Sequence, residues 1–260
     1  MDTAQTRLAV AQLTATLTTD FDVPTVLHTI AEHARDCFDA YSAVLVLLDR
    51  RNPEGEERPY IVAEALPDGH SADPQLHSIG PGYTSARDGA VTMIADLDAQ
   101  NDTSWPSYRE HAIAAGMRAV RAYPVTALAT PLGSLIVHTE EPWGSLRPNE
   151  FGQMLADITA IALSLGRVDG RRASTIETVR AVLHGTTVTA LAIGILAQVF
   201  GLDVDDARTR LAQLACAHGV TPAEQAQAIV AAQDTHPTDP AKSGALHPPE
   251  TPAAPRQFDS

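Results

Sequence analysis

The chain has 260 residues, of which 44% are hydrophobic, and it carries a formal net charge of −14 at pH 7. A chain of this length forms one large domain or two smaller ones, and its apolar content is sufficient for a packed core. The acidic balance excludes a general binder of nucleic acid or of anionic membranes, because both of those surfaces are negatively charged.

The ends of the chain and its cysteines indicate where the protein works. The N-terminus has no basic segment followed by an apolar run, so we expect no signal peptide. The apolar segment from Val188 to Leu202 is shorter than the ~20 residues that span a bilayer. Cys37 and Cys216 lie far apart and form neither a disulfide framework nor a CxxC pair. We therefore expect a soluble, cytoplasmic protein with reduced thiols and no cofactor.

Residues 1–168 are predicted to form an α+β domain, in which helices flank an antiparallel sheet. Helical spacing of apolar residues predicts the helices, and short apolar runs between turn residues predict the strands. Asp22 and Asn149 are expected to cap the helices that follow them. The predicted helices are Thr6–Leu17, Val23–Cys37, Pro106–Ala115 and Asn149–Leu165, and the predicted strands are Ser42–Leu48, Tyr60–Ala65, Ala90–Ile94, Ala119–Val125 and Leu132–Thr139.

Several strings between residues 5 and 168 resemble those of GAF domains. They are Gly80-Pro81, Asp96-Leu97, Trp105-Pro106, Gly116-Met117-Arg118-Ala119-Val120 and Gly133-Ser134-Leu135. GAF domains share a fold and differ in ligand. The resemblance implies a sensor of a small molecule or another signal, with Tyr83, Asp96 and Trp105 lining a cavity. In the alternative, Trp105 only fastens a loop to the sheet and the cavity is filled.

The chain departs from the GAF pattern at two positions. Such domains usually carry Cys after Gly-Pro and Arg before Trp-Pro, where this chain has Gly82 and Ser104.

Residues 169–232 are predicted to form three helices. The first lies within Ser174–Phe200, where Gly185 and the β-branched residues after it weaken the helical tendency. The second starts near Asp203 and stops at Gly219, a residue suited to the position after a helix. The third starts at Thr221, since a Thr cap, a Pro and a Glu follow the pattern of a capping box.

The residues of these helices resemble the ANTAR module, an RNA-binding domain of transcription antiterminators. The matching strings, over about residues 172–231, are Ala192, Gly194-Ile195-Leu196, Phe200-Gly201-Leu202, Asp205-Asp206-Ala207, Leu211, Ala226, Ile229 and Val230. A GAF domain followed by an ANTAR module is similar to the order in actinobacterial regulators. The resemblance implies a homodimer that binds RNA hairpins near a terminator. No membrane partner is expected.

The charge of this segment leaves few side chains for RNA phosphates. Residues 171–232 contain five arginines and five acids, whereas residues 1–170 contain 11 arginines and 23 acids. On a helix, Arg208 and Arg210 project about 200° apart and do not form one patch; the alternative is that they pair with Asp205 and Asp206. The candidate RNA-binding residues are Arg171, Arg172, Arg180, Arg208 and Arg210.

Leu191 and Ile193 define a second candidate surface. They stand where the ANTAR pattern has Gln and Lys, and they make the helix around them apolar on nearly all sides. A helix of that kind is usually buried, so we expect an interaction surface, within the chain or in a dimer. The alternative is tighter packing against the preceding domain.

The remaining patterns argue against an enzyme. The chain contains no GxGxxG, GxxxxGK[ST], HExxH or GxSxG string, and His28 and His33 lie on different helical faces. We expect no active site and no metal. Residues 233–260 contain six prolines and few apolar residues and are predicted to be a disordered tail.

Two hypotheses about function follow. The first is an RNA-binding antiterminator, in which a GAF-like sensor controls an ANTAR-like domain. The alternative is a degenerate ANTAR protein that has lost RNA binding and acts by dimerisation or by binding a protein partner.

Overall fold

The computed structural model describes residues 3–50, 57–67, 72–99, 104–144, 147, 149–168, 171–235 and 243–249. The chain divides into two compact units, residues 1–183 and 184–260. The division falls inside one helix, later in the chain than the boundary after residue 168 that the sequence suggests.

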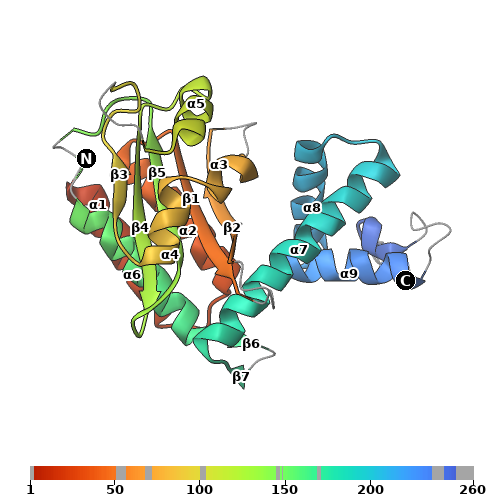
Figure 1. The fold of residues 1–260 in the computed structure, drawn as a ribbon. Coiled ribbons are helices and arrows are strands. Elements are labelled where there is room, and N and C mark those ends of the chain that lie inside the picture. The colour runs from red at the N-terminus through yellow and green to blue at the C-terminus, as the bar shows by residue number, and fades with distance from the viewer. Residues whose placement is uncertain are drawn as a thin grey trace, which may run out of the picture. The chain divides into compact units, whose positions relative to one another are not determined.

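The first unit is an α+β domain with a five-stranded antiparallel sheet in the order β2-β1-β5-β4-β3 (Figure 1). This order confirms the predicted antiparallel sheet with flanking helices. Its elements are α1 (Thr3–Leu17), α2 (Val23–Phe38), β1 (Ser42–Asp49), β2 (Arg58–Ala65), α3 (Pro74–Ser78), α4 (Pro81–Asp88), β3 (Thr92–Ile94), α5 (Pro106–Ala114), β4 (Ala119–Ala127), β5 (Thr130–Thr139), α6 (Asn149–Leu165), β6 (Arg167–Val168), β7 (Arg171–Arg172) and the start of α7 (Thr175–Phe200).

The sheet separates two hydrophobic cores, and β1 contributes to both. Leu45 and Leu47 face the core formed with α1, α2 and α6, which we call the α2/α6 core. Val44 and Val46 face the core formed with α3 and α5, which we call the α3/α5 core. Successive side chains of a strand point to opposite faces, so a strand with both faces covered is apolar throughout, as the sequence of β1 is.

Local signals explain where α2 begins and ends. The side chain of Asp22 accepts a hydrogen bond from the amide of Thr25 at 3.0 Å, which confirms the predicted cap. The helix ends at Asp39, which adopts the left-handed conformation with φ 50°. The sequence patterns indicate neither α3 nor α4, because both helices are short and contain few apolar residues.

The second unit is built around the second half of α7, with α8 (Val204–His218), α9 (Pro222–Thr235) and a 3-10 helix, η2 (Gly244–Leu246). The side chain of Asp203 caps α8 by accepting from the amide of Asp206 at 2.8 Å, and α8 ends at Gly219 with φ 67°. At the start of α9, Thr221 and Glu224 form the predicted capping box through reciprocal hydrogen bonds of 2.9 and 3.2 Å.

Part of the segment predicted to be a disordered tail is ordered. Leu246 of η2 is fully buried in the core of the second unit, and Gln225 of α9 donates to the carbonyl oxygen of Ala245 at 2.7 Å. The prediction for residues 243–249 is therefore wrong, because one leucine in a Pro-rich segment finds an apolar site that sequence composition does not reveal. Residues 236–242 and 250–260 lie outside the described residues.

Helix α7 contributes to the cores of both units. Val179 and Val182 belong to the α2/α6 core, whereas Ala192 and Leu196 belong to the core of the second unit. Among the described helices, α7 alone has the length and composition of a membrane span, with 33% of its apolar window buried. Its place in two protein cores accounts for the buried third of this window.

Candidate functional site

Tyr83, the first predicted sensor residue, is half-buried on α4. Its hydroxyl donates to the carbonyl oxygen of Glu57 at 3.5 Å, and the guanidinium of Arg87 lies 5.8 Å from the centroid of its ring. Tyr83 therefore contacts the residue just before β2 and a residue of its own helix.

Asp96 and Trp105 make contacts of a different kind. Asp96 accepts hydrogen bonds from the amide of Asp98 and the guanidinium of Arg118, each at 3.0 Å, and these bonds lower the pKa of Asp96. Trp105 packs against the α3/α5 core. Over the described residues, none of the three predicted sensor residues, Tyr83 included, lines either of the two pockets described below.

Four polar side chains lie buried together on the α3/α5 side of the sheet. His138 of β5 is fully buried; its Nδ1 lies 2.9 Å from the hydroxyl of Ser42, and its Nε2 lies 2.9 Å from the hydroxyl of Tyr108. His77 of α3 is 4% exposed, and its ring lies edge-on to that of His138 with centroids 5.5 Å apart. A neutral imidazole carries one N–H, so one hydroxyl donates to His138 and the other accepts.

Burial keeps this histidine cluster uncharged. Desolvation lowers the pKa of His77 to about 4, against a smaller opposing effect of Asp73. Desolvation also lowers the pKa of His138 well below its ordinary value, with His77 acting in the same direction. Burial raises the pKa of Tyr108. At neutral pH, therefore, the cluster offers hydrogen bonds and no charge.

Helix α4 closes the part of the sheet next to this cluster. A Cβ at Gly82 would lie 2.2 Å from Cδ1 of Ile136, and the hydroxyl of Ser134 donates to the carbonyl oxygen of Gly82 at 2.8 Å. The backbone of Gly80, with φ 88°, approaches the ring of Tyr108 so closely that a Cβ there would lie 2.5 Å from it. A side chain at residue 82 therefore requires the side chain of Ile136 to move.

A pocket of about 250 Å³ adjoins the cluster between α3 and α5. We call it the α3/α5 pocket. Tyr108, a member of the buried cluster, lines this pocket, and its hydroxyl lies 2.9 Å from Nε2 of His138. Its lining residues are Leu76, Ser78, Ile79, Ser107, Tyr108 and His111.

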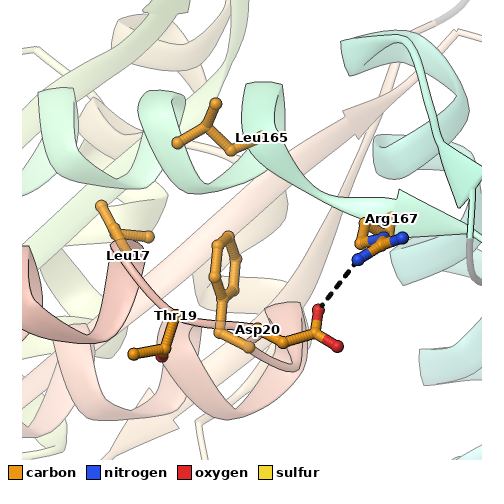
Figure 2. Close-up of a pocket in the computed structure, with 6 residues that line it drawn as sticks. Leu17, Thr19, Asp20, Leu165 and Arg167 are labelled. Carbon is orange, nitrogen blue, oxygen red and sulfur yellow. Dashed lines mark ion pairs between the residues drawn. The ribbon is translucent and has the colours of Figure 1, made fainter.

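A larger, more open pocket of about 460 Å³ lies on the other side of the domain. Figure 2 shows Leu17 and Leu165 near its apolar part and the ion pair between Asp20 and Arg167, whose charged atoms are 3.5 Å apart. Both charged side chains are largely exposed, so this pocket lacks the buried polar groups that distinguish the α3/α5 side.

The structure distributes the predicted RNA-binding arginines over both units. Arg171, Arg172 and Arg180 belong to the first unit. Arg171, on β7, lies 3.4 Å from the carboxylate of Glu177, and Arg180 is exposed on α7. Arg172 is on β7 as well.

The arginines of α8 differ from each other. Arg208 is exposed. The guanidinium of Arg210 is half-buried, 4.2 Å from the centroid of Phe200, and donates to the carbonyl oxygen of Leu246 at 3.5 Å. Arg210 therefore packs within the second unit, in contacts that its sequence position alone does not indicate.

Leu191 and Ile193, the two residues of the predicted interaction surface, differ in their exposure. Leu191 is 54% exposed, whereas Ile193 packs against the core of the second unit. The predicted surface thus consists of one exposed apolar residue beside one structural residue.

Sequence reasoning missed the buried cluster of Ser42, His77, Tyr108 and His138. The available sequence signal was a histidine, His138, directly after the apolar run Leu135–Val137; its pairing with Ser42 across β1 and β5 is visible only in the structure. Across the described parts of the chain, no group of three or more His, Cys, Asp or Glu side chains is placed to hold a metal ion.

The chain was compared with curated proteins and with solved structures. Comparison with curated proteins gives no match. Among solved structures, the chromophore-binding domain of a bacteriophytochrome from R. palustris is 13% identical, with a TM-score of 0.46 over 60% of this chain and 59% of that chain. Free methionine-R-sulfoxide reductase from Neisseria meningitidis is 16% identical, with a TM-score of 0.47 over 60% and 87%. The GAF domain of phosphoenolpyruvate-protein phosphotransferase from Acinetobacter is 15% identical, with a TM-score of 0.46 over 65% and 100%.

Comparison with protein families matches residues 22–163 to the GAF domain. These residues include every strand of the five-stranded sheet, the buried histidine cluster and the α3/α5 pocket. Because the match spans more than half of the sequence and coincides with the observed α+β domain, the chain belongs to the GAF domain family.

Proposed function

We propose that the chain is a cytoplasmic, non-enzymatic transcription regulator, in which the GAF domain senses a small molecule and the second unit is an ANTAR-like domain that binds RNA hairpins in nascent transcripts. The observation that carries this proposal is the core of the second unit, which directly follows the GAF domain. Six of the positions that resemble the ANTAR pattern are at most 2% exposed there, namely Ala192, Leu196, Ala207, Leu211, Ala226 and Ile229.

The RNA contacts of this proposal depend on few side chains. Arg180 and Arg208 are exposed, so they are suited to phosphate contacts, whereas Arg210 is committed to Phe200. Residues 184–235 contain two arginines and five acids. We therefore expect weak binding with a small salt dependence, because few phosphate contacts release few counterions.

A gel-shift titration with a two-hairpin terminator RNA tests the proposal. We expect the folded full-length chain to shift the RNA at low salt, with affinity falling as salt rises. Arg208→Ala should weaken binding and reduce the salt slope by about 1, the effect of losing one phosphate contact. Arg7→Ala is the control, because Arg7 is exposed on α1 in the other unit. No shift at low salt would contradict RNA binding.

The alternative, a protein that acts by dimerisation or partner binding, is favoured by the exposed side of α7. Leu191 is 54% exposed, and residues 181–202 contain no Asp, Glu, Lys or Arg. An uncharged helix face is a place where two chains of net charge −14 can meet without repulsion.

Replacing Leu191 tests that alternative. Leu191→Gln should weaken self-association at least about tenfold, since a buried leucine contributes about 1.5–3 kcal/mol and 1.4 kcal/mol corresponds to tenfold. Ile193 is left unchanged because it packs in the core. Sedimentation velocity over a concentration series measures the dimer fraction. Leu128→Gln is the control, as Leu128 is 98% exposed in the first unit. A wild-type chain that stays monomeric at all concentrations would exclude dimerisation through Leu191.

A further inference from the structure

Phe200, the last residue of α7, is the only Phe, Tyr or Trp in residues 184–235. It is half-buried, and the guanidinium of Arg210 lies over its ring, 4.2 Å from the centroid. The ring of His247 is nearly perpendicular to that of Phe200, with the two centroids 6.0 Å apart. The single aromatic ring of these helices therefore contacts one side chain of α8 and one of the C-terminal segment.

That C-terminal segment, residues 243–249, is held by few contacts, and we call it the strap. Of its side chains, only that of Leu246 is fully buried. Three helix side chains donate hydrogen bonds to its carbonyl oxygens over 2.7–3.5 Å, namely Gln225 to Ala245, His218 to His247 and Arg210 to Leu246. A segment with so few buried apolar contacts opens locally at a lower cost than the helices beneath it.

Opening of the strap changes the surroundings of Phe200. The ring loses its neighbour His247, and the N–H group of Arg210 that bonds Leu246 becomes free. Aromatic rings and the guanidinium planes of arginines are the groups on which proteins stack unpaired RNA bases. Stacking does not require a net positive charge, which suits a segment with two arginines and five acids in residues 184–235.

We infer that Phe200, braced by Arg210, stacks an unpaired base of the RNA, and that the strap covers this site in the RNA-free chain. The inference rests on the RNA binding proposed above and adds a base-stacking site to it. The base and His247 compete for the ring of Phe200, so RNA binding and closure of the strap exclude each other. A strap that is closed about nine-tenths of the time lowers the apparent RNA affinity about tenfold.

Leu246→Ser tests the cover, because it removes the one fully buried side chain of the strap. In gel-shift titrations with the two-hairpin terminator RNA, we expect this full-length variant to bind about tenfold more tightly than wild type. Leu128→Ser replaces a leucine that is 98% exposed in the first unit, and this control should leave the affinity unchanged. Equal affinities of Leu246→Ser and wild type, with equal helical circular dichroism, would overturn the cover.

Replacing Phe200 in the Leu246→Ser background tests the stacking site. Phe200→Leu keeps an apolar side chain without the ring and should weaken RNA binding at least about fivefold, the lower end of the effect of losing one base–aromatic stack. Phe200→Tyr keeps the ring and should retain the affinity. The salt slope should not change in either variant, since no phosphate contact is lost. Equal affinities with leucine and with tyrosine at this position would overturn the site.

Hydrogen exchange of the wild-type chain tests the cover without a variant. The amides of Leu246 and His247 donate to the carbonyl oxygens of Ser243 and Gly244 at 3.1 and 3.3 Å. We expect saturating RNA to raise the exchange rates of these amides, because the bound base displaces the strap. Unchanged or slower exchange in the RNA complex would overturn the cover, and this result decides the matter if Leu246→Ser fails to fold.

Failure of this inference differs from failure of the proposed function. If wild type shifts the RNA and neither set of variants alters the affinity, the inference is wrong and RNA binding stands. If neither wild type nor Leu246→Ser shifts the RNA at low salt, the RNA-binding proposal is wrong, and the inference falls with it.

Discussion

Replacing Gly133 by alanine should destabilise the GAF domain by about 3 kcal/mol or more, at the upper end of the effects of single substitutions. Gly133 of β5 pairs with Leu47 of β1, and a Cβ there would lie 1.9 Å from the carbonyl oxygen of Val46. The obstacle is backbone in a neighbouring strand, so relief requires moving β1 and both cores that it joins.

Tryptophan fluorescence during urea unfolding measures this effect. The chain has two tryptophans, Trp105 and Trp143, and both lie in the first unit. The fluorescence signal therefore reports unfolding of the first unit and not of the second. Gly144→Ala is the control, because a Cβ at Gly144 meets nothing within 4 Å, and it should change stability by less than about 0.5 kcal/mol. An unchanged midpoint for Gly133→Ala would show that β5 does not approach β1 this closely.

Acidification should destabilise the GAF domain between pH 6.5 and 4, because of His77. Burial lowers the pKa of His77 from 6.5 to about 4 in the folded state. The unfolded chain, with the ordinary pKa, binds more protons in this range, so the free energy of unfolding falls as pH falls. The full difference corresponds to about 3 kcal/mol. His138 acts in the same direction.

Urea unfolding at a series of pH values, in wild type and in His77→Phe, isolates this contribution. The variant retains the exposed carboxylates that respond to acid, including Asp88, whose pKa is lowered by Arg87. The difference between the two proteins therefore reports His77. We expect the stability of wild type to fall more steeply than that of the variant. Parallel curves would mean that His77 is not buried as a neutral ring.

Some elements follow from sequence because their causes are local. Asp22, Asp203 and the Thr221–Glu224 pair each cap a helix within a few residues of themselves, and such patterns are visible in any single chain. The continuous apolar run of β1 likewise marks a strand that is covered on both faces.

The site was harder to predict because its residues come from distant segments. Ser42, His77, Tyr108 and His138 are spread over almost a hundred positions, and no periodicity joins them. Arg210 is a second example. Its spacing along α8 indicates only the direction of its side chain, whereas its contact with the ring of Phe200 depends on how α7 and α8 pack.

By itself, the sequence determined the α+β class, the antiparallel sheet, the boundaries of most helices and the resemblance to GAF domains, because these depend on local spacing and on turn residues. Only the tertiary structure decided which polar groups meet beneath α3 and α5, and which apolar residue of α7, Leu191 or Ile193, remains exposed. Pairing of strands and packing of helices bring distant residues together, and burial then decides their charge.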